Sequence, residues 1–169
     1  MIVYPGKKIF ERDCFVHNGN YYATKISVYD NGNIECWGLM DKQEFLAKTK
    51  SGWITVDIPD GTGLRICDQD FVVNQEKTLN PDGSLMFIHK WITQESFIQD
   101  VLDAVHVAHG NKSASELCYE AYEGYLSNPS IVNRNKLEQV YLDVPSHNRQ
   151  YILGNQDVKD FPIRNILGI

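Results

Sequence analysis

The residues best suited to chemistry lie near the end of the chain, in the stretch SHNRQYILGNQDVKDFPIR at residues 146–164. Its charged and titratable side chains are His147, Arg149, Asp157, Lys159, Asp160 and Arg164. These groups could serve a hydrolase-type enzyme, or they could pair with one another in a structural clasp that fastens a charged segment to the body of the protein. Catalysis would also require a placed nucleophile or two carboxylates of different pKa, and the spacing supplies neither. The stretch is therefore predicted to be a clasp, and no catalytic residue is predicted.

Other residues with chemical potential have simpler structural explanations. His106 and His109 stand at i,i+3 spacing on a predicted helix, but no carboxylate accompanies them at ligand spacing, so no metal site is predicted. Cys36 lies in a predicted strand rather than in a basic or helix-terminal neighbourhood, which favours a packed thiol over a nucleophile. The four cysteines form no C-x-x-C pair and are expected to be buried free thiols: Cys14, Cys36, Cys67 and Cys118. No cofactor is predicted.

Two groups of residues are candidates for binding another protein. Trp37 and Trp53 lie in the turn-rich first half of the chain, and tryptophan is enriched where interfaces concentrate their binding energy. Glu116, Glu120 and Glu123 recur on one face of a predicted helix and form an acidic ridge there. Core packing for the tryptophans and a solvated helix face for the glutamates are the competing interpretations.

The charge balance limits the kinds of partner. The formal net charge is −6 and the pI is about 5.3, which argues against nucleic-acid binding, because displacing counterions from phosphates requires a basic surface. The same acidity favours a basic protein partner. No apolar run approaches the roughly 20 residues that cross a bilayer, and the start of the chain lacks the order of a secretory signal, so a cytoplasmic protein without membrane contact is expected. The sequence leaves the oligomeric state open.

The elements that must position these residues divide the chain into two halves. Residues 15–91 read as short strands, with Asn-Gly turn signals in HNGN and DNGN and one short helix at residues 41–52. From residue 93 the apolar period changes to that of helices, which are predicted at residues 93–110, 113–129 and 131–142, with a further short helix at 146–153 and an extended charged segment at 155–164. The predicted helix caps are Asp41, Thr93 and Ser113. The predicted fold is α+β, an antiparallel sheet of about six or seven strands packed on one face by three or four C-terminal helices.

No long linker separates the halves, so one domain is predicted over residues 1–169, with strands mainly in 1–92 and helices mainly in 93–169.

The chain also resembles a family of uncharacterised, mostly bacterial proteins. The segments that carry the resemblance are IECWGLMD, SGWITVDIPDG and HNRQYILGNQDVKDFPIRNI. The resemblance implies an intact single domain and supplies no catalytic residues. Together these observations favour a small acidic protein-binding protein of immunity-like or regulatory type, with a hydrolase-type enzyme as the alternative.

Overall fold

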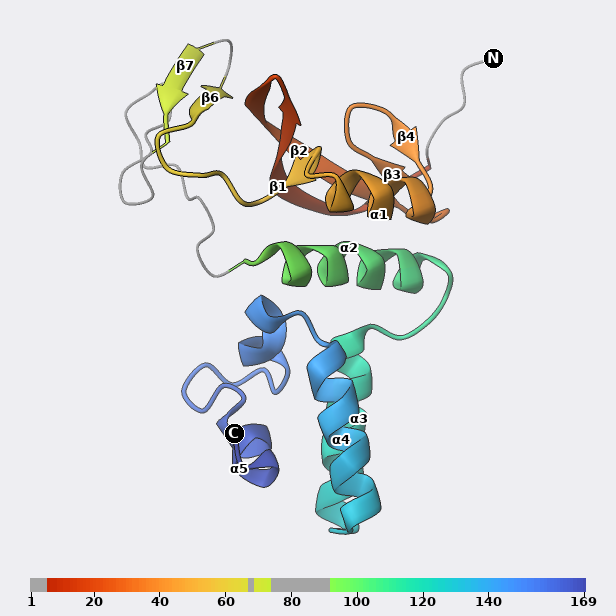
Figure 1. Ribbon diagram of the computed structural model, residues 1–169. Coiled ribbons are helices and arrows are strands. Elements are labelled where there is room, and N and C mark those ends of the chain that lie inside the picture. Colours follow the sequence, from red (N-terminus) through yellow and green to blue (C-terminus); the bar gives the residue numbers. More distant parts are fainter. Residues whose placement is uncertain (1–5, 67–68, 74–91) are drawn as a thin grey trace. The chain divides into compact units, whose positions relative to one another are not determined.

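The computed structural model describes residues 6–66, 69–73 and 92–169. The chain divides into two compact units, Met1–His109 and Gly110–Ile169, and each is described by itself (Figure 1). The first unit holds the sheet with two helices, and the second holds three helices and a 3-10 helix. The predicted α+β class is confirmed.

The sheet is built around a long hairpin. Strands β1 (Lys8–Asn18) and β2 (Asn20–Tyr29) pair antiparallel along almost their whole length, and Gly19 turns between them with a φ of 77°. The shorter strands are β3 (Ile34–Glu35), β4 (Leu39–Met40), β5 (Ile54–Thr55), β6 (Gly63–Ile66) and β7 (Gln69–Val72). Among the described residues the sheet has seven strands, in the order β4-β3-β2-β1-β5, with β6 and β7 joined to it through β2.

Most strand pairs among the described residues are antiparallel, as predicted, and one of them is parallel. β6 runs parallel to β2, with Tyr21 opposite Leu64. The strand predicted from SLMFIHKW lies outside the described residues.

Both predicted Asn-Gly turns are confirmed. At the second, Gly32 has a φ of 86°, and its amide donates to the Tyr29 carbonyl. A Cβ at this position would lie 2.8 Å from the His109 imidazole, so the turn also requires glycine because the histidine ring packs against it.

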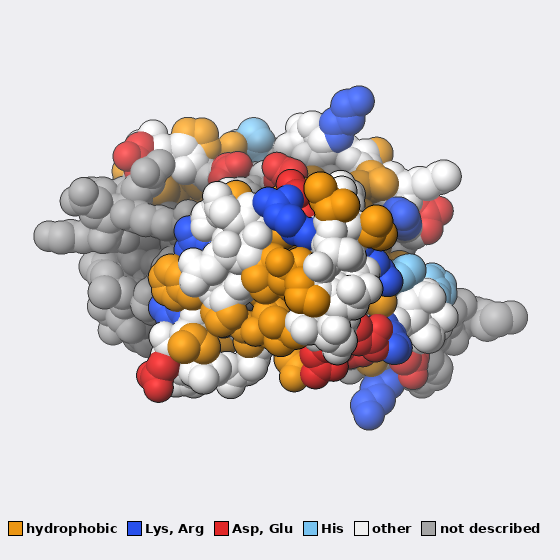
Figure 2. All heavy atoms as spheres, turned by 90° about the horizontal axis from the view of Figure 1, so that it is seen from below, with side chains coloured by type: hydrophobic (Ala, Val, Ile, Leu, Met, Phe, Trp, Pro, Cys, Tyr) orange, Lys and Arg blue, Asp and Glu red, His pale blue; other side chains and the backbone are white. Residues whose placement is uncertain are grey.

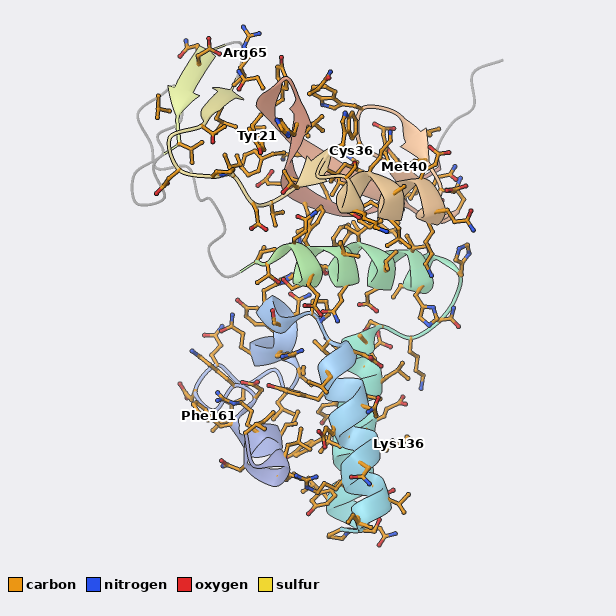
Figure 3. The ribbon with its side chains drawn as sticks, in the orientation of Figure 1. Tyr21, Cys36, Met40, Arg65, Lys136 and Phe161 are labelled. Carbon is orange, nitrogen blue, oxygen red and sulfur yellow. The ribbon has the colours of Figure 1, made fainter. Side chains whose placement is uncertain are left out.

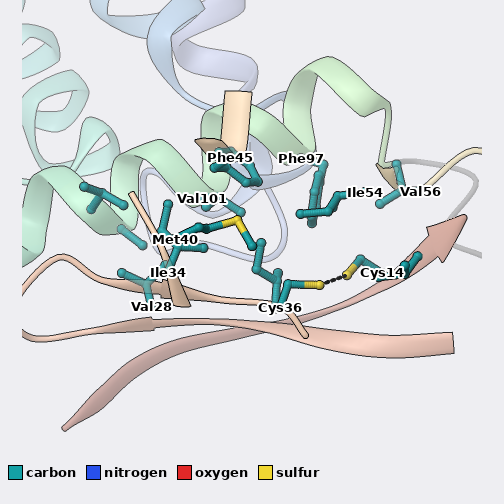
Figure 4. Packing of buried hydrophobic residues seen from close by; sticks show 14 residues of the cluster. Cys14, Val28, Ile34, Cys36, Met40, Phe45, Ile54, Val56, Phe97 and Val101 are labelled. Carbon is teal, nitrogen blue, oxygen red and sulfur yellow. Dashed lines mark hydrogen bonds between the residues drawn. The ribbon is translucent and has the colours of Figure 1, made fainter. Parts of the chain in front are cut away.

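Helices α1 (Lys42–Lys50) and α2 (Gln94–Ala108) pack against the sheet within the first unit. Asp41 caps α1 by accepting a hydrogen bond from the Glu44 amide, and Thr93 forms a capping box with Ser96 at the start of α2. Their apolar faces meet one face of the sheet in a cluster that includes Cys14, Val16, Ile26, Val28, Ile34, Cys36, Met40, Phe45, Ile54, Phe97 and Val101 (Figure 4).

The second unit has an apolar cluster of its own. Helices α3 (Ala114–Ser127) and α4 (Ile131–Asp143) are capped by Ser113 and Ser130, each accepting from the amide three residues on. The 3-10 helix η1 (Ser146–Tyr151) and helix α5 (Phe161–Leu167) follow. The buried cluster comprises Cys118, Ala121, Leu137, Tyr141, Val144, Ile152, Ile163 and Leu167.

The extended return predicted after Gly154 is wrong. Residues 156–160 form turns, and α5 begins at Phe161 with a proline in its first turn, where the missing amide hydrogen costs no helical hydrogen bond. Whether the two units unfold together, as the predicted single domain over residues 1–169 requires, is a question of cooperativity and stays a prediction.

Candidate binding site

The two tryptophans predicted to bind lie together in the first unit. Trp37 stands at the tip of the β3–β4 hairpin, where the Cys36 amide donates to the Gly38 carbonyl across it at 3.0 Å. Figure 3 shows Cys36 and Met40 on this hairpin. Trp53 lies between α1 and β5, and its carbonyl accepts from the His17 amide at 2.8 Å. The fold therefore brings together two tryptophan side chains that are 16 positions apart in the sequence.

The backbone of Trp37 is unusual. Its φ is 59°, in the left-handed region that a bulky side chain seldom adopts, at a cost of roughly 1–2 kcal/mol. The side chain is 51% exposed. A large apolar group is therefore held at a hairpin tip, half in solvent, in a conformation that glycine or asparagine would adopt more readily.

Three aromatic rings meet at this tip, and we call Tyr22, Trp37 and Trp53 the aromatic cluster. The centroids of the Trp37 and Trp53 rings are 5.9 Å apart with an interplanar angle of 88°, and those of Tyr22 and Trp37 are 5.2 Å apart at 59°. Such tilted pairs are favourable arrangements of aromatic quadrupoles. In neither of these two pairs do the rings stack face to face.

A cation of the protein itself lies over the face of the Trp53 ring. The Lys48 Nζ atom, from the last turn of α1, is 4.3 Å from the centroid of the Trp53 ring. This distance is within the range of a cation–π interaction. Sequence reasoning missed both Lys48 and Tyr22; the five-residue step from Lys48 to Trp53 across a helix end carries no recognised sequence signal.

A thiol pair lies behind Trp37 in the core. The Cys36 and Cys14 Sγ atoms are 3.9 Å apart, and both residues are buried (Figure 4). The hydrogen bond with Cys36 and burial raise the pKa of the Cys14 thiol. Cys14, Cys36 and Cys118 are free thiols, and Cys67 lies outside the described residues. Burial keeps the Cys36 sulfur from any substrate, which agrees with the prediction of a packed thiol.

A pocket of the first unit lies between α2 and the start of β1. This pocket of about 400 Å³ is lined by Ile9, Phe10, Asp30, Asp100, Asp103, Ala104, Val107 and Ala108. Asp100 is its buried carboxylate, and its Oδ2 atom accepts a hydrogen bond from Arg12 Nε at 2.8 Å. The charge that could have bound a ligand is thus already paired within the protein.

Several charged residues of the C-terminal stretch contact other residues of the second unit. The Asp160 carboxylate is buried and accepts a hydrogen bond from the Tyr141 hydroxyl at 2.7 Å. Arg149 donates from Nε to the Val144 carbonyl at 3.0 Å, and its guanidinium lies 4.9 Å from the Tyr141 ring centroid. Within residues 146–164, all of which are described, no ion pair joins Asp160 to Arg149 or Arg164.

The other members of this stretch do not converge on Asp160 as a catalytic set would. Arg164 stacks over Phe161 at 5.3 Å from the ring centroid, while Asp157 and Lys159 are exposed. His147 is half-buried in η1. Cys118 is the buried thiol of this unit, and burial raises its pKa to about 12, so it is not a ready nucleophile.

The acidic ridge is exposed, as expected both of a binding surface and of a solvated helix face. Glu116, Glu120 and Glu123 all lie on the solvent side of α3. Lys112 forms an ion pair with Glu120, and the pKa of Tyr119 is raised by its hydrogen bond with Glu123. The ridge is therefore partly neutralised by its own neighbours.

The second unit also exposes apolar side chains, and Figure 2 shows such side chains gathered on its surface. The exposed apolar residues of this unit include Leu126, Ile131, Val132, Tyr151, Phe161 and Ile169. None of them has a strained backbone, in contrast to Trp37.

Two negative findings apply to the described residues only. Residues 6–66, 69–73 and 92–169 contain no group of three or more His, Cys, Asp or Glu side chains placed to hold a metal ion. Within the same ranges, every helix is too short or too polar to cross a membrane.

The chain combines a sheet unit and a helical unit, and two family models divide it at nearly the same point. Residues 10–112 match the family described as Domain of unknown function (DUF7638), and residues 113–168 match Domain of unknown function (DUF7639). The chain belongs to the first of these families, whose model covers most of it, and its C-terminal part matches the second. Searches among curated proteins and among solved structures found no significant match. The predicted resemblance to an uncharacterised family is confirmed.

Proposed function

We propose that this protein is a small protein-binding protein, of immunity-like or regulatory type, whose contact surface is centred on Trp37. The observation that carries the proposal is the placement of Trp37, half-exposed at a hairpin tip in a left-handed backbone conformation. Backbone strain of this kind concentrates where residues contact ligands. Exposed tryptophan is also among the residues that contribute most to binding energy.

The partner we propose is a basic protein. The first unit, residues 1–109, contains 15 Asp and Glu residues and 10 Lys and Arg residues, a net charge of −5 out of the −6 of the whole chain. An acidic surface around an apolar contact would steer a basic protein toward it. A bacterial, cytoplasmic setting belongs to the same proposal.

The test is capture of partners by tagged protein from cells of the source organism, followed by mass spectrometry. The Trp37→Asn variant keeps a residue that tolerates the left-handed conformation and removes the indole. The matched control is Tyr151→Asn, which removes an aromatic side chain that is 66% exposed in the second unit.

We expect wild type and Tyr151→Asn to retain one basic partner that Trp37→Asn loses, while circular dichroism shows all three folded. A partner lost with Tyr151→Asn and retained by Trp37→Asn would move the contact surface to the second unit and refute the proposal. Equal capture by all three proteins would refute it as well.

A further inference from the structure

We infer that the aromatic cluster binds a cationic group of its partner, and that Lys48 occupies the place of that group in the free protein. The ligand class is an organic cation, namely a lysine, arginine or quaternary ammonium group presented by a basic protein. The inference rests on the proposed function and specifies what the surface around Trp37 recognises.

Lys48 already places a cation over the Trp53 ring. Its ammonium nitrogen is 4.3 Å from the Trp53 ring centroid, which shows that this ring face can accept an amine cation. The aromatic face is electron-rich and attracts cations, and indole attracts them most strongly among the aromatic side chains.

The Lys48 ammonium is held only weakly over the Trp53 ring. Lys48 forms none of the ion pairs found among the described residues, so none of their carboxylates holds its ammonium over the ring. A half-buried lysine side chain can also swing toward solvent, because its stem is long and flexible. An incoming cation can therefore displace it.

Lys48 and an external cation compete for the same face of the Trp53 ring. Two ammonium groups cannot share one ring face without repelling each other, so Lys48 lowers the affinity for an external cation. Trp37 stands beside Trp53 at 88° and is half-exposed, so a group arriving over Trp53 would also meet the Trp37 indole.

The experiment uses choline as the cation probe and 3,3-dimethyl-1-butanol as its neutral isostere, with the full-length protein. Binding is followed by the NMR shifts of the tryptophan indole N–H signals at constant ionic strength. The variants are Lys48→Met, which keeps the apolar stem and removes the charge, and Trp53→Leu, which removes the ring. Lys50→Met is the matched control, since Lys50 is exposed in the same helix and forms no cation–π contact with an aromatic residue in the described part of the chain.

We expect choline to shift the Trp37 and Trp53 signals at millimolar concentration and the neutral isostere to bind several-fold more weakly. Lys48→Met should bind choline about 2- to 5-fold more tightly than wild type, which corresponds to the loss of one exposed cation–π competitor. Lys50→Met should match wild type, and Trp53→Leu should lose the binding while remaining folded by circular dichroism.

Equal binding of choline and its isostere would overturn the inference, because it would show an apolar surface without preference for charge. No choline binding by wild type and Lys48→Met would overturn it too. In either case, partner capture that still depends on Trp37 would leave the proposed function standing, so the two failures are distinguishable.

Discussion

Replacing Tyr141 by phenylalanine should destabilise the second unit, and it tests directly whether the C-terminal stretch is a clasp. The Tyr141 hydroxyl donates to the Asp160 carboxylate at 2.7 Å, and Asp160 is only 9% exposed. Tyr141→Phe removes the donor without removing the ring, so a buried charged acceptor loses a hydrogen bond. The expected loss in the free energy of unfolding is about 1–3 kcal/mol at pH 8.

The same bond should give the wild type a characteristic response to alkaline pH. Burial, and then the hydrogen bond to Asp160, raise the pKa of Tyr141 to about 12 from its ordinary value of 10.0. The folded state therefore favours the neutral phenol, and this contribution to stability is complete below pH 10 and is lost as the pH rises toward 12. A shift of this size corresponds to about 2–3 kcal/mol, of which most should be lost by pH 11.5.

The assay is urea unfolding of wild type and Tyr141→Phe, followed by circular dichroism at 222 nm between pH 8 and pH 11.5. Other groups that titrate in this range, such as Cys118, cancel in the difference between the two proteins. That difference should shrink as the pH rises. The control is Tyr151→Phe, at an exposed position, which should match wild type throughout. A Tyr141→Phe variant within 0.5 kcal/mol of wild type, with a difference independent of pH, would show that this hydrogen bond does not fasten the stretch.

Two further predictions concern the packing of the chain. Trp37 and Trp53 belong to the first unit, so their fluorescence reports on that unit, while circular dichroism at 222 nm also reports the helices of the second. If residues 1–169 form one domain, the two urea transitions should coincide, and separate midpoints would contradict it. On α4, Leu137→Ala should lower the free energy of unfolding by about 2–5 kcal/mol because Leu137 is fully buried. Ile131→Ala, at a position that is 74% exposed, should lower it by less than about 0.5 kcal/mol. Similar losses for the two variants would contradict the packing of this helix.

The parts of the fold that the sequence predicted well are those specified by local chemistry. The Asn-Gly turns, the Asp41 cap of α1 and the Ser113 cap of α3 each depend on residues within a few positions of one another. The parallel pairing of β6 with β2 depends on contacts between residues more than 40 positions apart, which no local pattern encodes. The start of helix α5 was predicted as part of an extended charged segment, although proline is well tolerated in a first helical turn.

The candidate site shows the same division. Trp37 and Trp53 could be named from residue type, but their contact requires β5 to pair with β1 and the β3–β4 hairpin to pair with β2. In the C-terminal stretch, charge spacing suggested ion pairs among the charged residues. The buried carboxylate is instead satisfied by Tyr141, a neutral residue 19 positions away. Charge spacing could not indicate a neutral hydroxyl as the partner.

The energetics of the hairpin tip bear on the proposal that Trp37 is a contact residue. Its left-handed backbone costs roughly 1–2 kcal/mol, while each of its two aromatic pairs contributes about 0.5–1.5 kcal/mol beyond area burial. These terms are of similar size in the free protein, and the buried half of the side chain adds the stabilisation that comes from its own area burial. Asparagine or glycine would make the same turn with less strain. Trp37 is 51% exposed, and asparagine would offer a partner no comparable apolar area. Burying this exposed indole area against a partner would add binding free energy that is not realised in the free protein.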